Sequence, residues 1–275
     1  MKLLAVETST SYGSVAVVEV IPRSEATRDP FKVLAEGTIY SQMSHSERLL
    51  PLIDLLLSQS GVDISEIDYF AASIGPGSFT GLRVGLSTMQ AFAFAHQKKV
   101  VGVPTLEAMS LSGIFHEGPI CSFLDAGRGE LYAALYSVTS MGEATCLLPV
   151  SIQKPAALIL KLKEFLGCHS EGVTPCHSEG EARGIPQTPL LIGDISLIEK
   201  EISHEKTFKW SSLLFSQPRA SQVAQIAFNK IASGHAVDPD KLLPLYVRLP
   251  QAELSFRAQS ARNPIEDSSV LRTSE

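Results

Sequence analysis

A glycine-rich turn that leads into a helix is the stretch whose residue types most suggest chemistry. Gly75-Pro76-Gly77 lies between an apolar run at 69–74 and a helical pattern at 82–95. Ser78 or Thr80 can cap the first turn of this helix with a side-chain oxygen. The turn predicts either a phosphate or nucleotide contact, because a helix N-terminus attracts anions, or a tight corner with no ligand. The residues that would make the contact are Gly77, Ser78, Thr80 and Arg83.

A second polar stretch follows the first strand-like segment at 2–6. Glu7, Thr8 and Ser9 lie between that segment and another strand-like segment at 14–21. In such a hairpin the hydroxyl and N–H groups can face a phosphate, and the acid can hold a metal through water. An ordinary β-turn has the same composition. Glu7, Thr8 and Ser9 therefore join the candidate phosphate site, with the plain turn kept as the alternative.

The order of elements indicates a mixed α/β architecture with two related units. Three strands and then alternating helices and strands fill residues 1–104, which predicts a mixed sheet with helices on its faces. A second unit, 105–250, opens with a strand-turn-strand around Asp125 that loosely repeats the hairpin around Glu7, which suggests an ancient duplication. Residues 167–189 read as an insertion, and residues 251–275 as a polar tail without structure.

Two helices in the first unit, 45–60 and 78–96, carry more apolar and small residues than one core face needs. A helix that is apolar on most sides is deeply buried or forms an interface, and glycines on a helix face indicate a close neighbour. That neighbour is either internal or another chain. His45 is expected to be a surface residue beside the helix cap. The predicted interface residues are Leu49, Leu50, Ile53, Leu57, Gly81, Gly85, Met89 and Phe92.

Composition narrows the class of protein. The chain has 275 residues, 44% of them hydrophobic, and a net charge of -6, which makes it a poor stand-alone binder of nucleic acid. No apolar stretch approaches the ~18–20 residues that span a bilayer, and four cysteines without a disulfide pattern favour a cytoplasmic setting. Two Cys-His pairs, Cys168-His169 and Cys176-His177, lack the usual zinc-ligand spacing, so no metal site is predicted.

Four segments of the sequence resemble the TsaB (YeaZ) family. The glycine segment 75–85 is the most specific, and the likeness is dense over 2–105, looser to 248, and absent from the Cys-His insertion and the tail. The four segments are 4–10, 45–51, 75–85 and 244–248. The resemblance implies the ASKHA fold of actin, Hsp70 and sugar kinases, with two related βββαβα domains.

The resemblance also implies a function. TsaB-like proteins support the catalytic subunit TsaD, together with TsaE, in threonylcarbamoylation of the adenosine next to the anticodon in tRNAs that read codons beginning with adenine. It implies a non-catalytic subunit with no catalytic residues and no cofactor of its own. It leaves open ATP or ADP at the partner interface, tRNA contact through the complex, and a homodimer in the absence of TsaD.

A small-molecule kinase or ATPase on the same fold is the alternative. It would need Glu7 for Mg-ATP and a catalytic acid, for which Asp125 is the candidate, although a turn aspartate is usually a turn former. A metallopeptidase is disfavoured because the sequence has no H-E-x-x-H motif. If the helices form the interface, Leu50→Glu and Gly85→Arg should break partner binding and leave the fold largely intact.

Overall fold

The computed structural model describes residues 1–21, 31–40, 45–170, 188–203, 207–212 and 216–248. Contacts divide the chain into two units, Met1–Leu245 and Tyr246–Glu275. The first unit contains every helix and strand of the described residues. Of the second unit only residues 246–248 are described.

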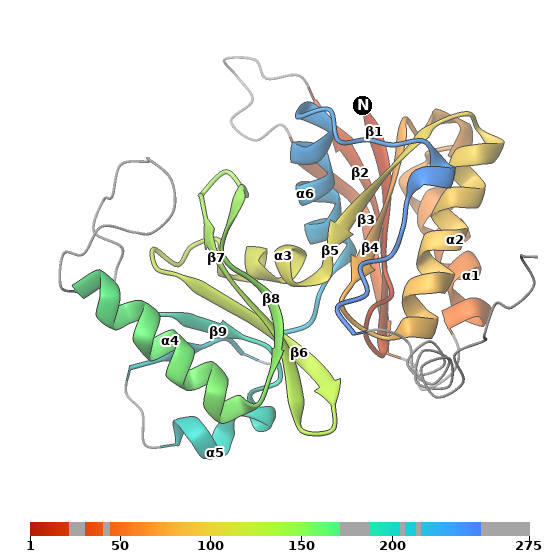
Figure 1. The fold of residues 1–275 in the computed structure, drawn as a ribbon. Coiled ribbons are helices and arrows are strands. Elements are labelled where there is room, and N and C mark those ends of the chain that lie inside the picture. The colour runs from red at the N-terminus through yellow and green to blue at the C-terminus, as the bar shows by residue number, and fades with distance from the viewer. Residues whose placement is uncertain (22–30, 41–44, 171–187, 204–206, 213–215, 249–275) are drawn as a thin grey trace, which may run out of the picture. The chain divides into compact units, whose positions relative to one another are not determined.

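The first sheet contains five strands: β1 (Lys2–Glu7), β2 (Tyr12–Val20), β3 (Phe31–Tyr40), β4 (Tyr69–Gly75) and β5 (Lys99–Pro104). Their order is β3-β2-β1-β4-β5, so the first strand of the chain lies in the middle (Figure 1). β1 pairs antiparallel with β2 and parallel with β4, and β5 runs parallel to β4. Residues 3–6 are fully buried because both faces of this strand are covered, which explains its continuous apolar run.

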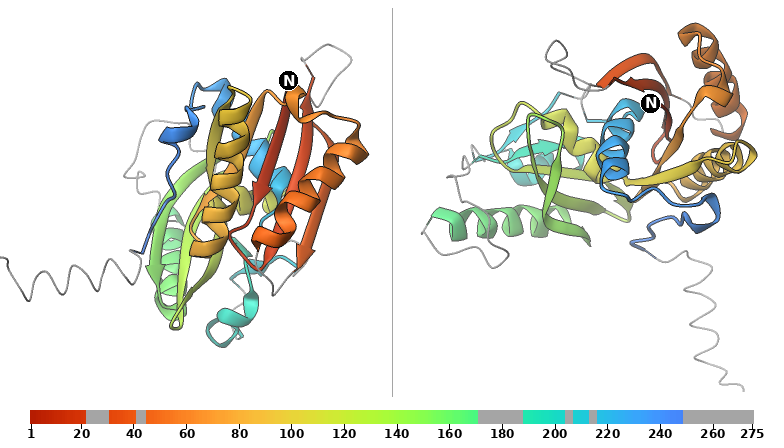
Figure 2. Two further views of the ribbon diagram at one scale, coloured as in Figure 1. Left: turned by 90° about the vertical axis from the view of Figure 1, so that its right-hand side faces the viewer. Right: turned by 90° about the horizontal axis from the view of Figure 1, so that it is seen from above.

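Helices cover both faces of the first sheet. On one face lie α1 (His45–Ser60) and α2 (Phe79–Ala95), side by side in Figure 2. On the other face lie α3 (Thr105–Ser110) and α6 (Ala220–Ala232). Leu4 and Val6 pack toward the first pair of helices, and Leu3 and Ala5 toward the second, as the alternation of a strand requires.

The second sheet also has five strands: β6 (Ile120–Gly127), β7 (Glu130–Val138), β8 (Ala144–Gln153), β9 (Leu190–Ile192) and β10 (Lys209–Trp210). Their order is β10-β9-β6-β7-β8. Helices α4 (Pro155–Ser170) and α5 (Glu199–Ile202) pack on one face. Leu106 and Met109 of α3 pack on the other face, so α3 contacts both sheets. Short 3₁₀ turns occur at Ile64–Glu66, Leu111–Gly113, Ile195–Leu197 and Pro239–Lys241.

The two sheets have the same topology. In each, three consecutive antiparallel strands place the first strand in the middle, and two further strands add to it in parallel. The repeated hairpin that the sequence suggested is therefore matched by a repeated sheet. The fold class, two related mixed sheets with flanking helices, is confirmed.

One helix packs away from the unit in which the sequence placed it. Residues 105–250 were expected to form the second unit, but α6 packs on the first sheet, and Val237 bridges to Val100 at the edge of β5. Val223, Ile226 and Ala227 are buried there because the apolar face of α6 completes the core against β1 and β2. The insertion expected at 167–189 falls largely outside the described residues, and the tail expected at 251–275 falls entirely outside them.

Candidate functional site

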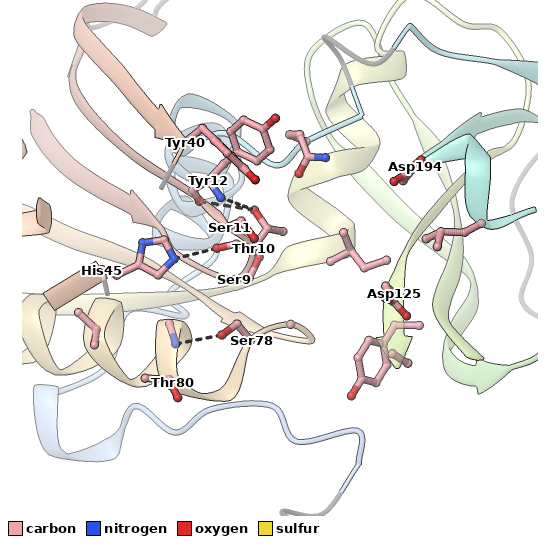
Figure 3. A pocket seen from close by; sticks show the side chains of 18 residues that line it. Ser9, Thr10, Ser11, Tyr12, Tyr40, His45, Ser78, Thr80, Asp125 and Asp194 are labelled. Carbon is pink, nitrogen blue, oxygen red and sulfur yellow. Dashed lines mark hydrogen bonds between the residues drawn. The ribbon is translucent and has the colours of Figure 1, made fainter. Parts of the chain in front are cut away.

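A cleft of about 710 Å³ lies between the two sheets (Figure 3). On the side of the first sheet it is bounded by the β1–β2 turn, the end of β3 and the starts of α1 and α2. On the side of the second sheet it is bounded by the end of β6, the start of β7 and the segment after β9. The lining residues that matter below are Ser9, Thr10, Tyr12, Tyr40, His45, Gly77, Ser78, Thr80, Gly81, Asp125, Tyr132 and Asp194.

The β1–β2 turn is held against the starts of both helices. The backbone N–H of Ser78 donates to the carbonyl oxygen of Ser9 at 2.6 Å, and Nε2 of His45 donates to the carbonyl oxygen of Thr10 at 2.8 Å. The half-buried His45 is thus a positioning group for the cleft wall, not the surface residue that the sequence predicted. These bonds make the cleft wall and the two helices one packed unit.

Glycines on α2 make this close approach possible. A Cβ atom on Gly81 would overlap the carbonyl oxygen of Thr8, and one on Gly85 would overlap the Thr8 hydroxyl. A Cβ on Gly77 would likewise overlap the backbone of Ser9. The close neighbour that the small residues indicated is therefore the chain's own β1–β2 turn.

Ser78 is the N-cap of α2. Its hydroxyl accepts from the N–H of Gly81 at 3.3 Å, as the sequence predicted. The N-terminus of this 17-residue helix opens into the cleft through Gly77, Ser78 and Thr80. This wall has the amide groups and helix dipole that suit an anion.

Glu7 does not reach the cleft. Its side chain is fully buried, Oε1 accepts from the Ser9 N–H at 2.5 Å, and Oε2 has no hydrogen-bond partner among the described residues. Burial raises the pKa of this carboxyl, and the Ser9 amide works in the opposite direction. The hypothesis of an acid that faces a phosphate directly is therefore wrong for this conformation.

Two carboxylates lie on the opposite wall, across the cleft from Ser9 and Ser78 (Figure 3). Asp125 Oδ1 accepts from the Gly127 N–H at 2.7 Å, which is the turn-forming role that the sequence allowed. Asp194 Oδ1 accepts from the N–H of Ser196 at 3.1 Å and from its hydroxyl at 2.7 Å. Sequence reasoning missed Asp194, although Gly193-Asp194 after β9 repeats the glycine-then-cap pattern of Gly77-Ser78 after β4.

The structure brings together only part of the predicted phosphate site. Ser9, Gly77, Ser78 and Thr80 line the cleft, and the buried Thr8 lies behind them. Arg83 is outside the cleft lining, with its guanidinium 4.0 Å from the centre of the Phe79 ring. The described residues contain no cluster of three or more His, Cys, Asp or Glu side chains that could hold a metal ion.

Most of the predicted interface residues lie in the chain's own core. Leu49, Ile53, Met89, Gly81 and Gly85 are buried within this chain. Leu57 and Phe92 are half-buried, Phe92 against Phe70 with ring centroids 6.0 Å apart. Of the eight, Leu50 is the clearly exposed one, at 51%.

This burial corrects the expectation for Gly85→Arg. An arginine at position 85 would drive its Cβ into Thr8, so the change would damage the fold as well as any interface. Leu50→Glu places a charge on an exposed side chain and keeps its value as a test of the interface.

The family model described as "TsaD: tRNA N6-adenosine threonylcarbamoyltransferase" matches residues 35–174. A "tRNA threonylcarbamoyladenosine biosynthesis protein TsaB" of Haemophilus influenzae is 36% identical over 134 residues, which is 48% of this chain and 52% of that protein. The match thus spans about half the length of that relative. The Bacillus subtilis protein of the same description is 27% identical over 262 residues, or 93% of this chain and 98% of the relative.

A solved structure has the same fold. "YeaZ from Pseudomonas aeruginosa" superposes with a TM-score of 0.65 at 23% identity, over 89% of this chain and 99% of that one. Together with the duplicated sheet topology, this identifies the fold as the ASKHA type. In the part of the chain that the structure describes, no helix is both long and apolar enough to cross a bilayer.

Proposed function

The chain belongs to the TsaB (YeaZ) family, and from this premise we propose that it is a non-catalytic subunit in the biosynthesis of threonylcarbamoyladenosine on tRNA. In this role it binds and supports TsaD, which transfers the threonylcarbamoyl group to the adenosine next to the anticodon. TsaE joins the complex, and tRNA is bound through it. The alignment with 98% of the B. subtilis TsaB protein is the observation that carries the proposal.

The proposed docking surface is the outer side of α1 and α2. Leu50 and Leu55 of α1 are 51% and 53% exposed, and Phe94 of α2 is 80% exposed. Large apolar side chains at such exposure, on two adjacent helices, suit burial against a partner (Figure 2). Leu50 thus stays in the proposed interface, and the five buried residues support it from beneath.

The cleft suits a supporting role better than phosphoryl transfer. None of its described lining residues is Lys or Arg, which phosphoryl transfer commonly uses to stabilise charge. The carboxyl of Glu7 is buried below the cleft floor. We propose no cofactor for this chain alone, and ATP or ADP only where the cleft or α2 meets TsaD.

Light scattering after size exclusion, with and without TsaD from the same organism, tests the proposal. We expect a heterodimer with TsaD, and threonylcarbamoylation of tRNA only when both proteins and TsaE are present. A self-associated chain without TsaD that converts to the heterodimer on mixing would support use of one surface for both. Failure of the two chains to associate would refute the proposal.

A small-molecule kinase or ATPase is the second candidate, favoured by one observation: Asp125 lines the cleft opposite the N-terminus of α2. ATP turnover by the purified chain, lost on Asp125→Asn, would establish that function. We expect no turnover above the level of the Asp125→Asn variant.

A further inference from the structure

Three buried oxygen atoms without hydrogen-bond partners lie near the carboxyl edge of the first sheet. They are Glu7 Oε2, Ser9 Oγ and Ser73 Oγ, and none forms a hydrogen bond with any described residue. All three residues are at most 2% exposed. Buried polar atoms normally pair with protein, ordered water or an ion, so this group calls for a ligand.

The three oxygens converge on one place. β1 and β4 are parallel neighbours with Val6 opposite Ala72, so Glu7 and Ser73 take the next position on each strand. The Ser9 N–H donates to Glu7 Oε1 and draws Ser9 beside the same carboxylate. The hydroxyls of Ser9 and Ser73 lie close enough to lower the pKa of Glu7, yet neither makes a hydrogen bond of normal geometry with it. Oxygens that are near one another but not bonded leave room for an ion between them.

The charge of the group favours a cation. Among the described residues no Lys, Arg or His pairs with Glu7, although a buried carboxylate is stable only when it is paired or protonated. The other two ligands are neutral hydroxyls, so a single positive charge balances the site. Mg²⁺ would leave a buried surplus charge, and it keeps several of its waters in octahedral geometry.

We propose that Glu7, Ser9 and Ser73 bind a potassium ion at the inner end of the cleft. Ser9 lines the cleft, which gives the ion a path from solvent. The ion would fasten the ends of β1 and β4 under the turn that contacts Ser78 and His45. Its effect would therefore reach the cleft wall and the starts of α1 and α2. The assignment does not depend on the identity of the partner protein.

Thermal unfolding of the full chain in potassium chloride or choline chloride tests the site. At about 150 mM of either salt the Debye screening is the same, so a difference reports specific binding. We expect the Tm to be about 2–4 °C higher in potassium chloride, because an ion that binds only the folded state raises the folding constant by 1 + [K⁺]/Kd. Titration of potassium at constant total salt should give a saturable curve.

Two variants separate the site from a general response to acidic groups. Glu7→Gln keeps the shape but removes the charge, and should abolish the difference between the two salts. Asp125→Asn removes an exposed acid near the end of β6, and should keep the full difference. Ser73→Ala should weaken the apparent potassium affinity severalfold. If Glu7→Gln does not fold, anomalous scattering from crystals soaked in rubidium chloride replaces it, with a peak expected among Glu7, Ser9 and Ser73.

Several results would overturn the proposal. They are equal Tm values in the two salts, a potassium effect that persists in Glu7→Gln, loss of the effect in Asp125→Asn, and absence of the rubidium peak. A Glu7-dependent shift produced by millimolar magnesium and not by potassium would also overturn it, because the site would then bind a divalent ion.

Discussion

The two sheets share a topology but differ at the two places where each meets the cleft. In the first half, the turn after β1 is buried against α2, and the helix after β4 has 17 residues. In the second half, Asp125 near the end of β6 is exposed, and β9 is followed by a 3₁₀ turn and the four-residue α5. One half has thus built a packed helical face, while its counterpart has kept a short connection. The difference places the chain's surplus apolar surface on α1 and α2 only.

Glycine substitutions in α2 and α4 should give the sharpest contrast, with opposite signs. Gly81→Ala places a Cβ on the Thr8 carbonyl and should cost about 3 kcal/mol of unfolding free energy, because the backbone cannot yield without strain. Gly167 lies in α4, and a Cβ atom added there would meet nothing within 4 Å, so Gly167→Ala should stabilise by about 0.5–1 kcal/mol. Urea unfolding of both variants measures the pair. Equal effects would mean that α2 does not require its glycines.

How far the sequence predicts this contrast depends on the kind of signal. Strands such as β7 and helices such as α2 follow from periodicity and punctuation, and Ser78 follows from cap chemistry. Burial of Gly85 against Thr8 could not be predicted, because a small-residue face looks the same whether its neighbour is internal or another chain. The packing of α6 on the first sheet is also a tertiary fact, since its amphipathic pattern fits either sheet.

The candidate site divides in the same way. Ser9, Gly77, Ser78 and Thr80 were found because turn and cap residues have a local signature. Asp194 was missed because its importance comes from the opposite wall, which only the closed fold brings across from Ser78.

Exposed leucines on the topologically equivalent helices α1 and α4 should separate docking surface from plain surface. Leu50 is 51% exposed and Leu160 is 59% exposed, so a glutamate at either position should leave the fold intact. Leu50→Glu should weaken TsaD binding about 100-fold, because a charge buried in an apolar contact loses its hydration. Leu160→Glu should leave the affinity unchanged. Isothermal titration calorimetry measures both, and a loss confined to Leu160→Glu would move the interface to the second half.

The acids Glu7 and Asp125 should differ in how they link stability to pH. Burial raises the pKa of Glu7 above its ordinary 4.5, so the folded chain holds a proton that the unfolded chain releases. The stabilisation from this proton is complete below pH 4.5 and is lost as pH rises through the folded pKa, at up to about 1.4 kcal/mol per pH unit. In choline chloride, Glu7→Gln should therefore gain stability relative to the parent as pH rises above 4.5. A parallel pH profile of the two proteins in denaturant melts would contradict this.

The caps after β4 and β9 should give the smallest difference. Ser78 caps α2 through Gly81, and Asp194 caps the 3₁₀ turn through Ser196. Ser78→Ala should cost about 1 kcal/mol, because the cap holds the first turn of a long helix that packs on the core. Asp194→Ala should cost no more than about 0.5 kcal/mol, since the short turn has little cooperative structure to lose. Chemical denaturation of the two variants measures the order. A larger loss for Asp194→Ala would mean that the short connection, and not α2, is the more firmly held wall of the cleft.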